Sequence, residues 1–199
     1  MDLFLRQHAM VHRAEMSQMG LYSFADEVWD GANDAVVRCV PPKFEHSIAW
    51  IIWHLARIED MTMNVLMAGR IQVFVQDAWL KKLDITATHS GNVVMDAADV
   101  TAFSESVDLD ALKAYRLAVG RATREAVSVL RPDEVRQKVS PARLGELLDD
   151  GSVPPEAMGL IDYWGGLTIA GLLLMPPTRH CLVHLNEAMK VKGKCLKLG

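Results

Sequence analysis

The segment from Phe44 to about Met67 constrains the fold most, because its apolar residues recur at the spacing of an α-helix. The recurring positions are Ile48, Ile51, Ile52, Leu55, Ile58 and Met61. Side chains at i, i+3, i+4 and i+7 share one face of a helix, whereas a half-buried strand alternates with a period of two. Gly69 fits the end of this helix, because glycine readily adopts the left-handed conformation that closes many helices. The segment therefore predicts a long helix that packs against other helices.

Helical spacing also occurs in four other segments, and no segment has a convincing strand pattern. The predicted helices are 8–38, 108–130, 156–175 and 176–192, with a separation or kink at Pro176 and Pro177. Proline interrupts the chain in "VPPKF", residues 40–44, because it removes an N–H donor and fixes φ. The stretches 70–107 and 131–165 are long connections, the first with a short helix around Ala78. These patterns predict an all-α bundle.

The size and charge of the chain limit its class. It has 199 residues, a mass of 22.1 kDa and a formal charge of −4, which suits a single domain spanning 1–199. Its basic run is the tail "KVKGKCLKLG", so no positive face supports binding to nucleic acid. The longest apolar run, "LTIAGLLLM" at 167–175, is far too short to span a bilayer. We therefore expect neither nucleic acid nor a membrane as a partner.

The cysteines indicate the redox setting. Cys39, Cys181 and Cys195 form no C-x-x-C pair, and their number is odd. Such spacing is typical of reduced thiols in a cytosolic protein rather than of a disulfide framework. The first residues, "MDLFLRQHAM", lack the charged region and apolar stretch of a signal peptide. We therefore expect a cytoplasmic protein whose thiols are reduced.

Histidines give the clearest candidate site. His180 and His184 lie one turn apart in "TRHCLVH", so both imidazoles face the same side of a helix. His54 lies in the middle of the apolar helix, where a polar ring without a partner costs free energy. These histidines are either hydrogen-bonded packing residues or ligands of one divalent ion, since three neutral imidazoles leave a coordination position for water or substrate. H-x-x-x-H without the glutamate of H-E-x-x-H leaves both interpretations open.

Several stretches resemble the DinB-like superfamily. "HSIAWIIWHLARIED" resembles its second-helix signature, and "TRHCLVHLNEA" resembles its late-helix H-x-x-x-H. "GRIQVFVQDAWLKKLDI" and "DLDALKAYRLAVGRATREAV" are consistent with it, so the resemblance runs from roughly Met10 to Lys190. It implies a four-helix bundle in up-down-down-up order, commonly a bacterial homodimer, with long connections that carry short extra helices. It also implies His54, His180 and His184 as ligands of a divalent ion, and imidazoles suit zinc, nickel or iron alike.

The resemblance also bears on activity. Some members of this family are thiol-dependent S-transferases and isomerases that use bacillithiol, mycothiol or glutathione, and a related domain supplies the iron site of ergothioneine-synthesis enzymes. It therefore implies a metal-dependent enzyme of the S-transferase or isomerase type, with a low-molecular-weight thiol or another small molecule as its partner. The alternative is a non-catalytic helical dimer that binds a small ligand or partner, with a structural or vestigial metal site. The sequence assigns no catalytic residue beyond the metal ligands.

Two acidic residues lie near the candidate ligands in sequence. Glu59 either orients an imidazole or forms an ion pair with an arginine such as Arg57 or Arg179, and the ion pair is favoured. Glu187 is either a fourth ligand or base, or a solvated helix residue.

Further histidines and tryptophans surround His54 in the sequence. His46, Trp50 and His54 follow one another at i, i+4 and i+8, so they should stack along one stripe of the helix. His46 is too far from His54 to share an ion and is expected to be a cap or surface residue. Trp53 is expected to pack in the core, and His89 lies on a connection that could reach the metal.

Overall fold

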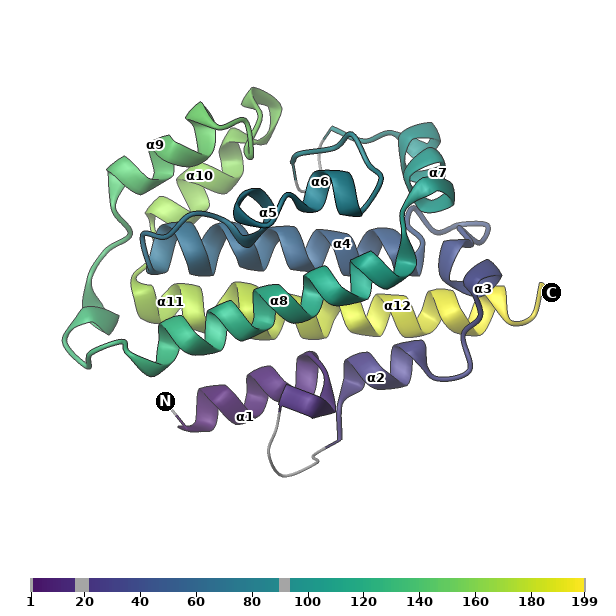
Figure 1. Cartoon of the computed structure of the whole chain (residues 1–199), viewed down its shortest axis with the longest axis horizontal. Coiled ribbons are helices and arrows are strands. Elements are labelled where there is room, and N and C mark those ends of the chain that lie inside the picture. Colours follow the sequence, from purple (N-terminus) through teal and green to yellow (C-terminus); the bar gives the residue numbers. More distant parts are fainter. Residues whose placement is uncertain (1, 17–21, 90–93, 199) are drawn as a thin grey trace.

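Helices make up almost all of the regular structure (Figure 1). The computed structural model describes residues 2–16, 22–89 and 94–198. Over those ranges the chain forms no strand, and its strand-like pairing is an isolated antiparallel bridge between Lys138 and Thr168. The predicted all-α class is therefore confirmed. In chain order the elements are α1 (Asp2–Val11), η1 (Ala14–Met16), α2 (Phe24–Trp29), α3 (Asp34–Arg38), α4 (Ile48–Glu59), η2 (Asp60–Met67), α5 (Val73–Gln76), α6 (Trp79–Lys82), α7 (Ala97–Ser106), α8 (Leu109–Ser128), η3 (Glu134–Arg136), α9 (Pro141–Asp149), η4 (Pro155–Ala157), α10 (Met158–Gly165), α11 (Ile169–Leu174), η5 (Met175–His180) and α12 (Cys181–Cys195).

Helix α4 lies at the centre, and every one of its residues is buried. Ser47 caps its N-terminus, because the serine hydroxyl accepts a hydrogen bond of 3.0 Å from the backbone N–H of Trp50. The helix runs without a break into η2, a π-helical segment, and the left-handed Gly69 (φ 63°) follows its end. The predicted helix is thus confirmed from Ile48 to Met67. Since all faces of α4 are buried, other elements must cover it all round.

Helices α8 and α12 lie alongside α4, and α1 and α2 pack against α12 (Figure 1). Asp108 caps α8, because its carboxylate accepts a hydrogen bond of 2.8 Å from the backbone N–H of Ala111. Leu112, Tyr115 and Val119 of α8 are fully buried in the core that α4 and α12 share. The predicted helix 108–130 is therefore confirmed, apart from its last two residues.

The predicted helix 8–38 is wrong, because the chain forms α1, η1, α2 and α3 there instead. Ser23 and Asn33 each cap a new helix, with side-chain oxygens that accept hydrogen bonds of 3.0 Å from the backbone. Such caps compete with a continuous helix. Gly31 has a φ of 64°, which lies outside the right-handed helical region. Residues 17–21 of this prediction lie outside the described residues.

The chain from 156 to 192 also differs from the prediction. Thr168 caps α11 by accepting a hydrogen bond of 3.2 Å from the N–H of Gly171, so α10 and α11 are separate helices. Pro176 and Pro177 do not separate α11 from α12, because the chain stays helical through η5. The irregularity at the prolines takes the form of a π-helical turn, a common accompaniment of interrupted backbone hydrogen bonding. No helix in the described part of the chain is both long and apolar enough to cross a membrane.

The two long connections cover the outer side of α4 (Figure 1). The stretch 70–107 carries α5, α6 and α7, and the stretch 131–165 carries α9 and α10. Ala78 adopts a left-handed conformation (φ 52°) between α5 and α6, so a helix centred on it is wrong. Residues 90–93 lie outside the described residues. The connections thus supply the cover that a fully buried α4 requires.

Buried polar side chains fasten both connections to α4 and η2. Arg57 donates hydrogen bonds to Oε1 of Gln72 (2.7 Å) and to the backbone carbonyl of Thr88 (2.6 Å). Gln72 in turn donates to Asp150, after α9, at 2.8 Å. Asp60 accepts bonds of 2.9 and 2.8 Å from two backbone N–H groups at the start of α5, although burial still raises its pKa. A buried polar group that loses its partner destabilises the fold, so these bonds fix where the connections lie.

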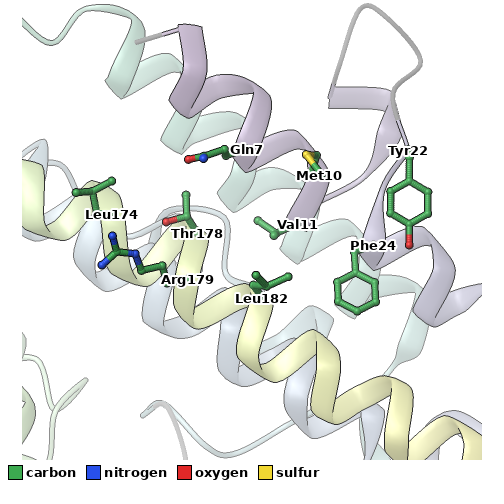
Figure 2. A pocket seen from close by; sticks show the side chains of 9 residues that line it. All are labelled: Gln7, Met10, Val11, Tyr22, Phe24, Leu174, Thr178, Arg179 and Leu182. Carbon is green, nitrogen blue, oxygen red and sulfur yellow. The ribbon is translucent and has the colours of Figure 1, made fainter.

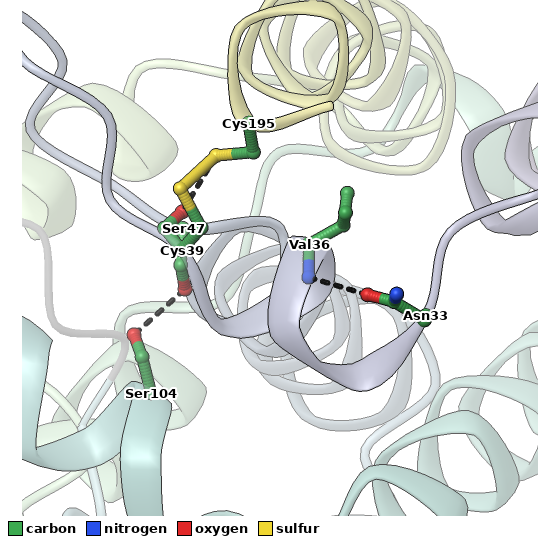
Figure 3. Close-up of a disulfide and its surroundings, with 6 residues drawn as sticks. All are labelled: Asn33, Val36, Cys39, Ser47, Ser104 and Cys195. Atoms are coloured by element: carbon green, nitrogen blue, oxygen red, sulfur yellow. Dashed lines mark hydrogen bonds between the residues drawn. A yellow bond between two sulfur atoms is a disulfide. The ribbon is translucent and has the colours of Figure 1, made fainter. Parts of the chain in front are cut away.

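Cys39 and Cys195 form a disulfide that joins the end of α3 to the end of α12 (Figure 3). Their Cα atoms are 6.2 Å apart, within the range that a disulfide requires, and 156 residues separate them in the chain. The prediction that all thiols are reduced is therefore wrong for this pair, because sequence spacing does not tell which cysteines the fold brings together. Cys181 is free and buried. The crosslink ties α12, which carries His184, to the segment before α4.

Candidate metal centre

The three candidate histidines converge on one point between α4 and the junction of η5 and α12. One ligand atom from each of His54, His180 and His184 lies within 4.8 Å of the others. The Nε2 atoms of His54 and His180 are 3.2 Å apart. Helical geometry explains the pair, because His180 and His184 are one turn apart on a continuous helix. The structure therefore brings together the residues that the sequence singled out.

The spacing of these nitrogens fits a divalent ion. Two nitrogens 3.2 Å apart, each ~2.1 Å from one ion, subtend about 100° at it, between the octahedral and tetrahedral angles. Burial and, to a smaller extent, the neighbouring His54 and His184 lower the pKa of His180 to about 2. His180 is therefore neutral at ordinary pH, the form in which an imidazole binds a metal.

Glu187 orients His184. Its Oε2 atom accepts a hydrogen bond of 2.8 Å from Nδ1 of His184, which leaves Nε2 of that ring for a metal. Its Oε1 atom accepts a bond of 3.0 Å from Nδ1 of His46, and these two bonds lower the pKa of Glu187 to about 2. Glu187 is thus not among the three ligand atoms, so its predicted role as a fourth ligand is not supported, and its half-buried side chain is bonded to two histidines rather than simply solvated. His46 is partly buried and held by Glu187, so its interpretation as a cap or surface residue is wrong.

Aromatic stacking fixes the position of His54. The Trp50 ring lies between His46 and His54, with centroid distances of 3.7 and 5.0 Å and nearly parallel planes. The predicted stripe on α4 is therefore confirmed. Trp53 is fully buried and packs on the core, as expected. His89 lies edge-on to Trp53 and is not part of the histidine group, so the idea that it reaches the metal is not supported.

A cavity of about 210 Å³ borders the three histidines. Helix α10 supplies three of the residues that line it, namely Leu160, Tyr163 and Trp164. The remaining lining residues are Ile58, Met175 and Pro176. The connection 131–165 thus covers the mouth of the site, whereas no residue of the connection 70–107 lines this cavity.

Comparison with known proteins identifies the family. Residues 24–158, more than half of the chain, match the model of the DinB superfamily. The chain belongs to the DinB superfamily. No curated protein matches its sequence. A crystal structure described as a conserved protein from Enterococcus faecalis is similar to the whole fold of this DinB-superfamily protein, with a TM-score of 0.68 and 13% identity over 98% of this chain and 96% of that chain.

The family match covers one of the three candidate ligands, and the geometry of the fold brings in the other two. The matched residues include His54 but end before His180 and His184. The likeness to the Enterococcus faecalis protein, at 13% identity, shows the fold alone. The two later histidines of this DinB-superfamily protein are therefore placed at the site by the geometry of η5 and α12.

A second cluster lies five residues further along α4, where Glu59 meets two histidines of α1. The Nε2 atoms of His8 and His12 each lie 2.8 Å from one oxygen of Glu59, and all three side chains are fully buried. The sequence analysis missed His8 and His12. Their signal is "HAMVH", residues 8–12, which has the same H-x-x-x-H spacing as the pair in "HCLVH".

The Glu59 cluster contains a buried ion pair, which Glu59 forms with Arg116. Arg116 and Thr123 donate to the two carboxylate oxygens at 2.7 and 2.8 Å, so the histidines and these residues take up all four acceptor positions of Glu59. Burial alone would raise the pKa of Glu59, but its neighbours His12 and Arg116 bring it well below its usual value.

The ion pair of Glu59 also reaches the candidate metal centre. The sequence favoured an ion pair for Glu59 but named Arg57 or Arg179 as its partner, and the partner is Arg116. Arg116 donates a second hydrogen bond, of 3.2 Å, to Sγ of Cys181, the residue after His180. The two clusters of this DinB-superfamily protein are thus joined through α8.

A larger cavity, of about 490 Å³, lies between α1 and the η5–α12 helix (Figure 2). Its walls are mostly apolar, and Arg179 is the charged residue among them. Figure 2 shows Arg179 at the opposite end from Tyr22 and Phe24. None of the candidate metal ligands lines this cavity, so the smaller one beside the histidines is the candidate site for chemistry.

Proposed function

We propose that this protein is a divalent-metal-dependent enzyme in which His54, His180 and His184 bind one ion. The observation that carries the proposal is the cavity of about 210 Å³ that all three histidines border. A catalytic metal site has three protein ligands and an open position that a substrate can reach, whereas a structural site is closed by a fourth ligand. Among the described residues, no fourth histidine, cysteine or carboxylate joins the three ligand atoms. The geometry therefore favours a catalytic site over a structural one.

The chemistry we propose is activation of a thiol. A bound divalent ion lowers the pKa of a coordinated thiol, which suits the S-transferase or isomerase reaction that the family resemblance implies. The protein's own residues orient and shield the site. Glu187 holds the ring of His184, Trp50 packs against His54, and α10 covers the cavity and limits the access of water. Zinc, nickel and iron each suit three imidazoles.

The second candidate is a non-catalytic dimer with a structural ion, and the lining of the cavity favours it in one respect. Apart from the three histidines, the cavity is lined by no carboxylate or amine that could act as a general base.

We also propose the homodimer and the up-down-down-up order of four main helices that the family resemblance implies. Light scattering of the purified protein tests the dimer.

Elemental analysis of protein purified without a tag tests the metal-dependent function. We expect about one equivalent of a divalent ion per chain, and addition of that ion at 100 times its Kd should stabilise the metal-free protein by about 2.7 kcal/mol. The variant His184→Ala should lose both the ion and any activity with a thiol. His89→Ala is the matched control, because His89 lies outside the histidine group, and it should keep the ion. A wild-type protein that binds no ion, or a His184→Ala variant that binds it as tightly, would overturn the proposal.

A further inference from the structure

The walls of the cavity beside the histidines carry no charge. Its lining residues other than the histidines are Ile58, Leu160, Tyr163, Trp164, Met175 and Pro176. The tyrosine hydroxyl and the indole N–H are the polar groups among these side chains. An apolar wall with few polar groups binds the apolar body of a ligand, and the polar groups fix its orientation.

The volume of the cavity limits the size of that body. A dry apolar cavity of about 150 Å³ is large enough to hold a benzene molecule, whereas sites for drug-sized ligands measure about 300–1,000 Å³. At about 210 Å³, this cavity has room for one ring and a short substituent. A ligand of tripeptide size has to leave most of its atoms outside.

The charged side chains bonded to His184 and to Cys181, the residue after His180, are already engaged. Both oxygens of Glu187 accept hydrogen bonds from histidines, and Arg116 is held by Glu59 and Cys181. Neither residue lines the cavity. An ammonium group placed against these walls would lose its water without gaining a partner and would be repelled by the bound ion, and a carboxylate would have only the ion itself as a partner.

We propose that the substrate held against the histidines is a compact, uncharged thiol with an apolar body of about one ring. A zwitterionic peptide thiol such as glutathione does not fit inside this cavity. The inference rests on the proposed metal-dependent function, because the thiol sulfur is the group presented to the ion. Leu160 and its neighbours on α10 then determine which thiol binds, since α10 supplies three of the residues that line the cavity.

Isothermal titration of the zinc-loaded protein with three thiols tests the proposal. The probes are phenylmethanethiol, which is neutral and apolar, cysteamine, which is smaller and cationic, and glutathione. We expect phenylmethanethiol to bind at least about tenfold more tightly than either of the others, a difference typical of small changes in an apolar pocket. It should also bind at least about tenfold more weakly to the metal-free protein. Equal or tighter binding of glutathione or cysteamine would overturn the proposal.

Two variants of α10 with the same replacement give a matched comparison. Leu160→Gln places an amide in the cavity wall at similar volume, and it should weaken phenylmethanethiol about tenfold while zinc content stays unchanged. Met158→Gln changes an exposed residue of the same helix that does not line the cavity, and it should leave binding as in the wild type. Equal affinity of the two variants would overturn the role of the cavity.

Zinc content separates the two possible failures. If the wild-type protein binds neither zinc nor any other divalent ion, both the proposed function and this inference fail. With one equivalent of zinc but no preference for phenylmethanethiol, the inference fails and the metal centre stands.

Discussion

The substitution Glu59→Leu tests how the N-terminal helix is held to the bundle. Glu59 has no exposed surface, and its two oxygens accept four hydrogen bonds, from His8, His12, Arg116 and Thr123, at 2.7–2.8 Å. Leucine has a similar volume, so the change removes the charge and the acceptors without opening a large cavity. Arg116 then keeps its positive charge in the interior without a counter-ion.

The expected loss follows from this burial. Removing one partner of a buried ion pair destabilises a protein by about 3–5 kcal/mol, because the remaining charge is left without water or a counter-ion. The pair of Arg70 and Glu125 provides the control. Its atoms are 3.4 Å apart and its side chains are 40% and 70% exposed, so Glu125→Leu should change the free energy of unfolding by less than about 1 kcal/mol.

Urea unfolding at neutral pH, followed by tryptophan fluorescence, measures both variants. The double variant Glu59→Leu/Arg116→Leu removes the two charges together and should be less destabilised than the sum of the single variants. If Glu59→Leu unfolds at the same urea concentration as Glu125→Leu, then Glu59 is not the buried counter-ion of Arg116, and the account of this cluster is refuted.

Three further predictions concern other parts of the structure. Burial holds the folded-state pKa of His12 at about 3, below its ordinary value of 6.5, so the unfolded chain takes up that proton first as the pH falls. Lowering the pH from 7 to 5 should therefore reduce the free energy of unfolding by about 2 kcal/mol through His12, and His180, whose pKa is also far below 6.5, adds a further loss. Urea titrations should show a total loss of at least about 2 kcal/mol, and an unchanged midpoint would contradict this. Glu187→Gln should weaken zinc binding at least about tenfold in a chelator competition, because the charged carboxylate no longer orients His184. Reduction of the disulfide between Cys39 and Cys195 should lower the free energy of unfolding by up to about 5 kcal/mol, the chain-entropy value for a 156-residue loop, and Cys195→Ser should melt identically with and without reductant.

The parts of the fold that the sequence predicts are those where one signal dominates. The periodic apolar residues from Ile48 onward specify α4 because nothing competes with helix formation there. The helix 8–38 fails because Ser23 and Asn33 offer side-chain caps inside a periodic stretch, and periodicity alone does not weigh a local cap against a continuing helix. The disulfide fails for another reason. Pairing of Cys39 with Cys195 depends on tertiary structure, which no local pattern contains.

The candidate site was predictable in its ligands but not in their supports. His54, His180 and His184 follow from spacing and from the family resemblance, and the structure brings them together. The carboxylate of Glu187 was assigned other roles because its partner His46 lies 141 residues away in the chain. The packing of α10 over the cavity could not be predicted either, because the sequence of a helix in a long connection does not indicate which surface it packs on.

The two clusters on α4 each contain an H-x-x-x-H pair, but they differ in the charges around the pair. One pair, His180 and His184, meets a third imidazole of α4 beside a cavity, and no carboxylate of the described residues joins the three ligand atoms. The other pair meets Glu59, whose acceptor positions Arg116 and Thr123 share. A cation entering the second cluster would have to displace the guanidinium that already neutralises the carboxylate. We therefore expect one equivalent of metal per chain rather than two, and a second equivalent that disappears in Glu59→Leu would show that the competition with Arg116 has been misjudged.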